Sequence, residues 1–262
     1  MSPLDPTQLH MALVVFALAM ARTSGMMLIT PIFGRGIITG LTRNGIIISW
    51  ALPVIAYAWR TKPTNLDVMY LSPILGLCLK ELVVGLLLGM PVATIVWGVE
   101  AAGTFIDNQR GATMASLLNR ATGNQASPLG ALLAQLYVTW LFVTGGFSTV
   151  IAILYGSYDI WPLWRFQPAF GPAFVTEILR LADVVMLLTL LLAGPAIVAM
   201  FLSELGLALI SRFAPQLQVF FLAMPVKSAV GLFLLILSLT NVLITADKHV
   251  PSAVVIFNHV VK

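Results

Sequence analysis

Residues 107–130 read DNQRGATMASLLNRATGNQASPLG and lie between two strongly apolar segments, residues 82–99 and 129–155. The stretch differs from both neighbours because it is rich in glycine and small neutral polar side chains, and its only charges are Asp107, Arg110 and Arg120. Irregular backbone is tolerated inside a membrane only where protein or a water-filled cavity satisfies its N–H and C=O groups. The stretch is therefore either a loop in solvent or the lining of an internal passage, and the rest of the chain is interpreted as the structure that holds it in place.

The composition of the chain is that of an integral membrane protein. Of the 262 residues, 59% are hydrophobic and 9% are charged, and the mean hydropathy is +0.98, whereas soluble domains carry about a quarter charged residues. The apolar runs are continuous rather than alternating, which argues against a membrane β-barrel. We therefore predict an all-α fold in which residues 1–262 form a single membrane subunit with broken helices and helical hairpins.

Most of the apolar runs that should form helices are short or interrupted. These runs are residues 10–32, 44–59, 71–79, 82–99, 129–155, 184–203 and 228–246. Proline should kink the second run at Pro53, and helix breaks are expected at Gly145-Gly146, Gly194-Pro195 and Met224-Pro225. A subunit whose helices pack mainly on other protein could carry such breaks, because its partners satisfy the freed backbone groups.

Small and aromatic side chains suggest where helices meet each other and where they meet the membrane surface. Gly85 and Gly89 are four residues apart, so they share one helix face at which a neighbouring helix could approach closely. The proline-containing segment 158–172 carries Trp161, Trp164 and Phe166. We interpret it as a connector at the membrane interface with aromatic anchors.

The sharpest charged feature is the pair Lys80-Glu81 inside an apolar run. Adjacent residues on a helix point about 100° apart, so the two side chains are expected to reach different surfaces. Charges within a membrane are costly and usually face a partner or a cavity, which predicts an inter-subunit or proton-linked contact. The alternative is a helix end at the membrane surface, with the Lys80 stem extending toward water.

The other charges admit simpler interpretations. Asp107 and Arg110 are three residues apart and can form a local ion pair that fixes the following loop, and Glu100 would share a face with Asp107 if the helix continues. Arg212 at a helix end is favoured by the helix dipole. We predict inter-subunit or buried-charge positions at Lys80, Glu81, Glu100, Glu204, Arg212 and Lys227.

No catalytic or metal-binding constellation is present in the sequence. The three histidines, His10, His249 and His259, lie near the termini without metal-ligand spacing, and Cys78 is the single cysteine. There is no nucleophile elbow, zinc-protease motif or phosphate-binding loop. We therefore expect neither enzymatic activity nor a metal or cofactor. The scattered basic residues form no cluster, so a nucleic-acid partner is not expected either.

Residues 103–130, GTFIDNQRGATMASLLNRATGNQASPLG, resemble the central region of the FliR/SctT family of type III secretion export-apparatus proteins, and in particular its injectisome branch. Three further stretches agree in the same order. They are Lys80-Glu81-Leu82 with Gly85 and Gly89, residues 201–215 (FLSELGLALISRFAP), and residues 222–228 (LAMPVKS). The resemblance covers most of the chain.

The resemblance implies a core subunit of an export gate in the bacterial inner membrane, lifted toward the periplasm. It implies SctR-like (FliP-like), SctS-like (FliQ-like) and SctU-like (FlhB-like) partners, and exported unfolded polypeptides as substrates. The C-terminal hairpin, residues 184–246, would resemble the SctS/FliQ fold. A plug loop would occupy residues 107–123, with pore positions at Asp107, Arg110, Gly111, Met114, Leu117, Leu118, Asn119, Arg120 and Gly123. Arg120 stands where many relatives have proline.

Two other classes of function remain as alternatives at this point. A secondary transporter of a small molecule could use broken helices at Pro53, Pro91 and Pro195 to surround a site near the middle of the membrane. An intramembrane enzyme would need a nucleophile with an adjacent base, and no such pair is evident. In the export-gate interpretation, small polar groups along residues 107–130 line the passage, and a few apolar side chains close it against water.

Overall fold

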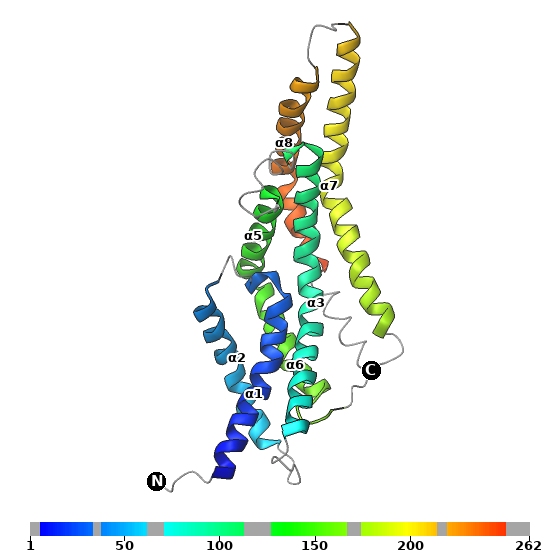
Figure 1. The fold of residues 1–262 in the computed structure, drawn as a ribbon. Helices are drawn as coiled ribbons and strands as arrows, with labels where there is room; N and C mark the ends of the chain where they lie inside the picture. Colours follow the sequence, from blue (N-terminus) through cyan, green and yellow to red (C-terminus); the bar gives the residue numbers. More distant parts are fainter. Residues whose placement is uncertain are drawn as a thin grey trace. The chain divides into compact units, whose positions relative to one another are not determined.

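The computed structural model of the chain describes residues 6–33, 38–61, 71–112, 127–166, 174–213 and 219–249. These residues are mostly helical and contain no strand, so the predicted all-α fold is confirmed (Figure 1). The elements are α1 (Pro6–Ile29), the 3-10 turn η1 (Pro31–Phe33), α2 (Gly40–Arg60), α3 (Leu71–Gln109), α5 (Pro128–Val143), α6 (Gly146–Ile160), α7 (Phe174–Phe213) and α8 (Val219–Asp247).

Within the described residues, four helical stretches are long and apolar enough to cross a membrane. They are Leu9–Ile29, Pro73–Gln109, Phe174–Phe213 and Leu222–Asp247. The two shorter helices α5 and α6 pass the same test only as a pair with a break between them. Since about 20 apolar residues are needed to span the hydrocarbon core, the prediction of an integral membrane protein is confirmed.

Contacts divide the chain into two compact units. Unit 1 comprises Met1–Ala93, Gly145–Ile178 and Ser252–Lys262, and unit 2 comprises Thr94–Thr144 and Leu179–Pro251. In unit 1, apolar side chains of α1 and α2 form the centre of a core, which includes Val15, Leu18, Ala51 and Val54, all almost completely buried. Leu163, which follows α6, is fully buried in the same core.

Glycine allows α1 and α3 to approach backbone to backbone in unit 1. A Cβ atom built on Gly85 would lie 2.0 Å from the carbonyl oxygen of Arg22, and one on Gly25 would lie 2.3 Å from that of Leu82. A Cβ on Gly89 would lie 2.8 Å from the carbonyl oxygen of Met26. No larger side chain fits these positions, so the predicted close approach of a helix at Gly85 and Gly89 is confirmed.

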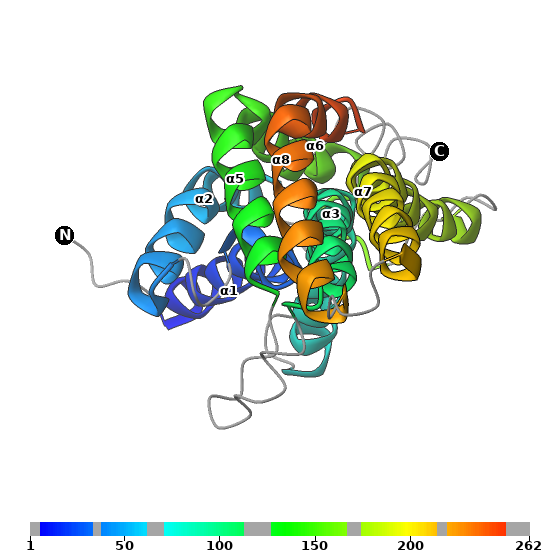
Figure 2. The same cartoon turned by 90° about the horizontal axis from the view of Figure 1, so that it is seen from above.

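In unit 2, α3 contacts α5, α7 and α8. In the view from above, the labels of α5 and α8 lie to the left of α3 and that of α7 to its right (Figure 2). A Cβ atom on Gly103 would lie 2.7 Å from the Cα atom of Gly130, so α3 and α5 also meet at a glycine pair. The long helices α7 and α8 run antiparallel. Their contacts pair Met200 with Gly231 and Glu204 with Lys227.

Some predicted helix breaks are wrong and one is confirmed. The chain breaks between α5 and α6, where Gly145 has a φ of 80° that glycine adopts readily. By contrast, α3 runs through Lys80-Glu81, α7 through Gly194-Pro195 and α8 through Met224-Pro225. A proline removes one backbone donor and can kink a helix, but Pro195 and Pro225 lie inside α7 and α8 without ending them.

The segment after α6 differs from the predicted interfacial connector. Trp161 is only 6% exposed and lies in unit 1, so this indole is not a membrane anchor. Trp164 donates from its indole N–H to the carbonyl oxygen of Ala58 at 3.3 Å, which attaches the segment to α2. Phe166 is 61% exposed. The segment therefore turns mainly toward the protein.

Candidate functional site

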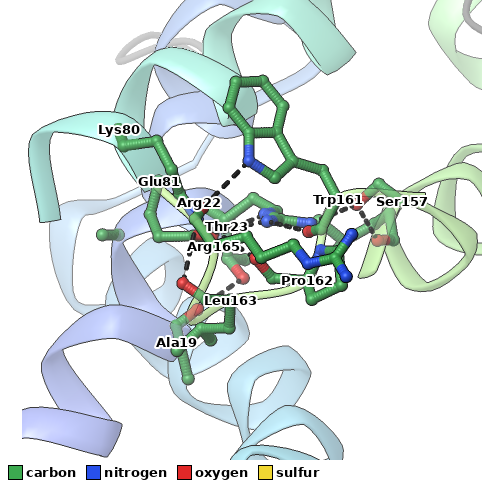
Figure 3. Close-up of polar contacts among 12 residues, drawn as sticks. Ala19, Arg22, Thr23, Lys80, Glu81, Ser157, Trp161, Pro162, Leu163 and Arg165 are labelled. Atoms are coloured by element: carbon green, nitrogen blue, oxygen red, sulfur yellow. Dashed lines mark hydrogen bonds and ion pairs between the residues drawn. The ribbon is translucent and has the colours of Figure 1, made fainter. Parts of the chain in front are cut away.

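Two buried polar networks, one in each unit, contain half of the predicted charged positions that the structure describes. The first joins Arg22 on α1 to Glu81 on α3 (Figure 3). Arg22 donates from Nε to Glu81 Oε2 at 2.6 Å and from an Nη atom to Oε1 at 3.0 Å. Both side chains are fully buried, and the fork geometry is the strong form of an ion pair.

Arg22 also binds the end of α6. Its guanidinium donates to Ser157 Oγ at 2.8 Å and to the carbonyl oxygen of Trp161 at 2.9 Å. The guanidinium carbon lies 3.9 Å from the ring centroid of Tyr158, a cation–π distance. One side chain thus connects three helices of unit 1. Arg22 is a charge inside an apolar run, which is a sequence signal for such a role, but it is not among the predicted site residues.

Lys80 extends from α3 into the same network. Its ammonium donates to the carbonyl oxygens of Leu163 at 2.9 Å, Arg165 at 3.1 Å and Pro162 at 3.4 Å, and it also contacts the Glu81 carboxylate. The expectation that Lys80 and Glu81 reach different surfaces is therefore wrong, because a long lysine stem can bend back toward its neighbour. The helix-end alternative is also wrong, since both residues lie inside α3. An inter-subunit contact at this pair remains a prediction.

The second network is centred on Asp107, near the end of α3 in unit 2. The carboxylate is fully buried and forms the predicted ion pair with Arg110, whose Nε lies 2.7 Å from Oδ1. Its other oxygen, Oδ2, accepts from Ser127 Oγ at 2.5 Å and from the backbone N–H of Leu129 at 3.0 Å. Asp107 therefore joins the end of α3 to the start of α5.

The start of α5 explains why this carboxylate is stable. Ser127 is the N-cap residue, and its hydroxyl oxygen accepts from the backbone N–H of Gly130 at 2.9 Å. A cap of this kind satisfies a backbone donor that has no partner within the helix. An anion is favoured there because the first turn of a helix carries partial positive charge.

The end of α3 contacts α8 as well. Arg110 donates to Ser228 Oγ at 3.4 Å, and Gly111, just after the helix, has a φ of 79°. A side chain at Gly111 would be strained at that angle, and it would lie beside the side chain of Met224. Three helices of unit 2 therefore meet where α3 ends.

The remaining predicted site residues lie apart from these networks. Lys227 on α8 forms an ion pair with Glu204 on α7 at 2.5 Å, where the Glu204 side chain is 45% exposed. Glu100 is half-buried in α3, and Arg212 is exposed in the last turn of α7. The other predicted plug positions lie outside the described residues. They are Met114, Leu117, Leu118, Asn119, Arg120 and Gly123.

Ser127, Ser157 and Ser228 each complete one of the networks, and sequence reasoning missed all three as partners of charged side chains. Ser157 and Ser228 lie inside apolar helices, where a serine gives no distinct signal because its hydroxyl usually bonds to the carbonyl of the preceding turn. Ser127 precedes Pro128, and a serine followed by proline is a signal for the start of a helix that could have identified this cap. Across the part of the chain that the structure describes, no group of three or more His, Cys, Asp or Glu side chains could hold a metal ion.

Long apolar helices, charges paired inside the protein and glycine-mediated helix contacts define a helical integral membrane protein. The family described as bacterial export proteins, family 1, matches residues 13–252. The chain belongs to this family. It is 39% identical over 237 residues to the Yop proteins translocation protein T of Yersinia pestis, covering 90% of each chain.

Two further relatives extend the comparison. The chain is 31% identical over 249 residues to the secretion system apparatus protein SsaT of Salmonella typhimurium, covering 92% of this chain and 94% of the relative. It is 26% identical over 230 residues to the flagellar biosynthetic protein FliR of Bacillus subtilis, covering 87% of each chain. Of these three relatives, the flagellar protein is the least similar, which agrees with the predicted resemblance to the injectisome branch.

Proposed function

We propose that this chain is a non-enzymatic core subunit of a type III secretion export gate in the bacterial inner membrane. The observation that carries the proposal is the family match, which extends over residues 13–252 and so includes both units. Relatives that match along nearly their full length are named for translocation and for a secretion apparatus. These relatives favour protein export over the transport of a small molecule.

The proposed gate element is the segment from Asp107 to Gly123, which would line and close a passage for unfolded effector polypeptides. The Asp107 network supports this placement, because it joins α3 to α5 on either side of residues 113–126. Met114, Leu117 and Leu118 supply apolar side chains between Gly111 and Gly123 in the sequence. Apolar groups that meet at a constriction expel water and so block ions without using charge.

The proposed partners are SctR-like and SctS-like gate subunits and an SctU-like protein. Exposed apolar side chains on α7 and α8 support such partners, since Leu190, Leu202, Phe233 and Ile236 are each at least 60% exposed. We propose that the α7–α8 pair forms an SctS-like hairpin over residues 184–246. Its apolar surface would face neighbouring subunits in an assembly raised from the membrane toward the periplasm.

Conductance measurements would test the proposed gate. The wild-type chain and a variant lacking residues 114–118 are each purified with the co-expressed subunits and placed in a planar bilayer. A matched control replaces the same residues with a glycine-serine linker of equal length, which keeps the span and removes the apolar side chains. We expect both variants to assemble and to conduct small ions that the wild type excludes.

Two results would count against the gate. A deletion variant that assembles and excludes small ions as well as the wild type does would show that these side chains do not seal a passage. Failure of both variants to assemble would show that the segment is part of a structural core, the role that Met and Leu most often have.

A further inference from the structure

The buried network of unit 1 carries more positive than negative charge. Arg22 and Lys80 are cations, whereas Glu81 is the single carboxylate that they share. Glu81 is already bound through both oxygens by Arg22, at 2.6 and 3.0 Å. The Lys80 ammonium also contacts this carboxylate, but one carboxylate cannot neutralise two cations, so part of the Lys80 charge must be stabilised by other groups.

Those other groups are backbone carbonyl oxygens of the segment that follows α6. The ammonium of Lys80 lies 2.9 Å from the oxygen of Leu163, 3.1 Å from that of Arg165 and 3.4 Å from that of Pro162. An ammonium has three N–H donors, which are shared among these three carbonyl oxygens and the Glu81 carboxylate. The Trp161 ring adds a cation–π contact, with its centroid 5.5 Å from Nζ.

The carbonyl oxygen of Leu163 depends most on this cation, because the oxygen of Pro162 also accepts from the backbone N–H of Arg165 at 3.1 Å and the oxygen of Arg165 also accepts from the indole N–H of Trp161 at 3.1 Å. Helix α6 ends at Ile160, and the backbone then turns through residues 161–166 without forming a helix. Leu163 is fully buried, and a buried carbonyl without a partner destabilises the fold. The carbonyl end of a helix also carries partial negative charge, which stabilises a nearby cation.

We propose that Lys80 acts as a tethered monovalent cation, and that these carbonyl oxygens, the Glu81 carboxylate and the Trp161 ring form a binding site for an alkylammonium ion. Backbone carbonyl oxygens take the place of water around cations in other membrane proteins. In this chain the cation is supplied by a side chain of α3. Lys80 is thus a positioning residue that holds the turn after α6 against α3.

Replacing Lys80 by alanine gives the sharpest test, because it removes three carbons and the ammonium, the atoms of propylammonium. The full chain is purified with its co-expressed subunits, and its thermal midpoint is measured with increasing propylammonium chloride. Lys80→Ala should lower the midpoint by at least about 4 °C, as expected from losing several charged hydrogen bonds in a chain of this size. Propylammonium should restore at least half of that loss in a saturable manner.

Three controls separate a specific site from general effects. Tetramethylammonium chloride matches the ionic strength but has no N–H donor, and 1-propanol matches the carbon chain but has no charge. Lys227→Ala removes a lysine whose partner is the Glu204 carboxylate instead of a set of carbonyls. Propylammonium should raise the thermal midpoint of Lys227→Ala by no more than it raises that of the wild type. Equal effects of all additives on Lys80→Ala and wild type would overturn the proposal.

A double variant tests whether Lys80 is instead a counter-ion for Glu81. Lys80→Met with Glu81→Gln removes one charge of each sign and keeps side chains of similar size. Glu81→Gln alone is measured as well, because it also leaves Arg22 without its carboxylate. If the carbonyl groups are the main partners of Lys80, the losses of midpoint in the two single variants add in the double variant. A double variant that is no less stable than Glu81→Gln alone would overturn the proposal.

Should Lys80→Ala yield no complex, the yield from cells grown with propylammonium replaces the thermal measurement. An increase that tetramethylammonium does not give supports the site, and the absence of such an increase overturns it. None of these measurements depends on secretion or conductance, so this inference and the proposed gate can fail separately.

Discussion

At the scale of single residues, Asp107 shows how one carboxylate organises unit 2. It accepts hydrogen bonds from Arg110, from Ser127 and from the backbone of Leu129, and it is fully buried. Every one of these partners is a donor. A neutral amide at this position would therefore direct its own N–H groups toward other donors, and it would leave Arg110 without its anion.

We expect Asp107→Asn to destabilise the assembled chain by about 3–5 kcal/mol, the cost of breaking a buried ion pair by removing one partner. The measurement is the thermal midpoint of the purified complex, or its yield if the variant does not assemble. Asp159→Asn is a matched control, because Asp159 is exposed on α6. Equal midpoints for the two variants would show that the Asp107 network contributes little to stability.

Glu81 and Glu204 both pair with a lysine, but replacing them by glutamine should lower the thermal midpoint by different amounts. Glu81 is fully buried, whereas the Glu204 side chain is 45% exposed beside Lys227. Glu81→Gln leaves the buried cations Arg22 and Lys80 without an anion, which should cost about 3–5 kcal/mol. Glu204→Gln should cost less than about 1 kcal/mol, because solvent screens the exposed pair. A larger loss from Glu204→Gln than from Glu81→Gln would contradict this order.

At the scale of helices, the contact between α1 and α3 depends on the absence of side chains. A Cβ atom at Gly85 would lie 2.0 Å from a backbone oxygen of α1, whereas a Cβ atom at Gly156 on α6 would meet nothing within 4 Å. Gly85→Ala should therefore separate the two helices and reduce the yield of the complex. Gly156→Ala should be neutral or stabilising, because alanine favours a helix by about 1 kcal/mol relative to glycine. Similar yields would show that the helices can move apart without loss.

The features that depend on local spacing were predictable from the sequence. The pairing of Asp107 with Arg110 follows from a separation of three residues on a helix, and the small-residue face of α3 follows from Gly85 and Gly89. The partners of Lys80 were not predictable. They are backbone carbonyl oxygens 82 to 85 residues further along the chain, and backbone oxygens carry no sequence signal. Helix continuity at Pro195 and Pro225 was also missed, because a proline inside a helix removes a single backbone hydrogen bond and does not always end the helix.

At the scale of the whole molecule, the described surface of α8 divides into two kinds of apolar position. Phe233, Ile236 and Leu237 are 63–70% exposed, whereas Leu235 and Val242 are at most 5% exposed. In an export gate, the exposed positions would be covered by neighbouring subunits. In a chain surrounded by lipid, they would contact acyl chains instead.

Cysteine crosslinking distinguishes these environments. Single cysteines at Phe233, Ile236 or Leu237, in a background where Cys78 is alanine, should crosslink to a neighbouring subunit in the purified assembly. Cysteines at Leu235 and Val242 are matched controls and should not, because these positions are buried within unit 2. Crosslinks found only within the chain, or a chain recovered alone, would contradict a place for α8 in a multi-subunit gate.

The bidentate pair of Arg22 and Glu81 also constrains how the protein is made. Arg22 lies 59 residues before Glu81 and 135 residues before Ser157. At about 5–20 residues per second, the ribosome needs roughly 3–12 s after Arg22 to synthesise Glu81. During that interval α1 carries an arginine without its carboxylate, at a cost of about 2.5–3.5 kcal/mol in the middle of a bilayer. Helix α1 thus reaches its final position only after α3 has been synthesised.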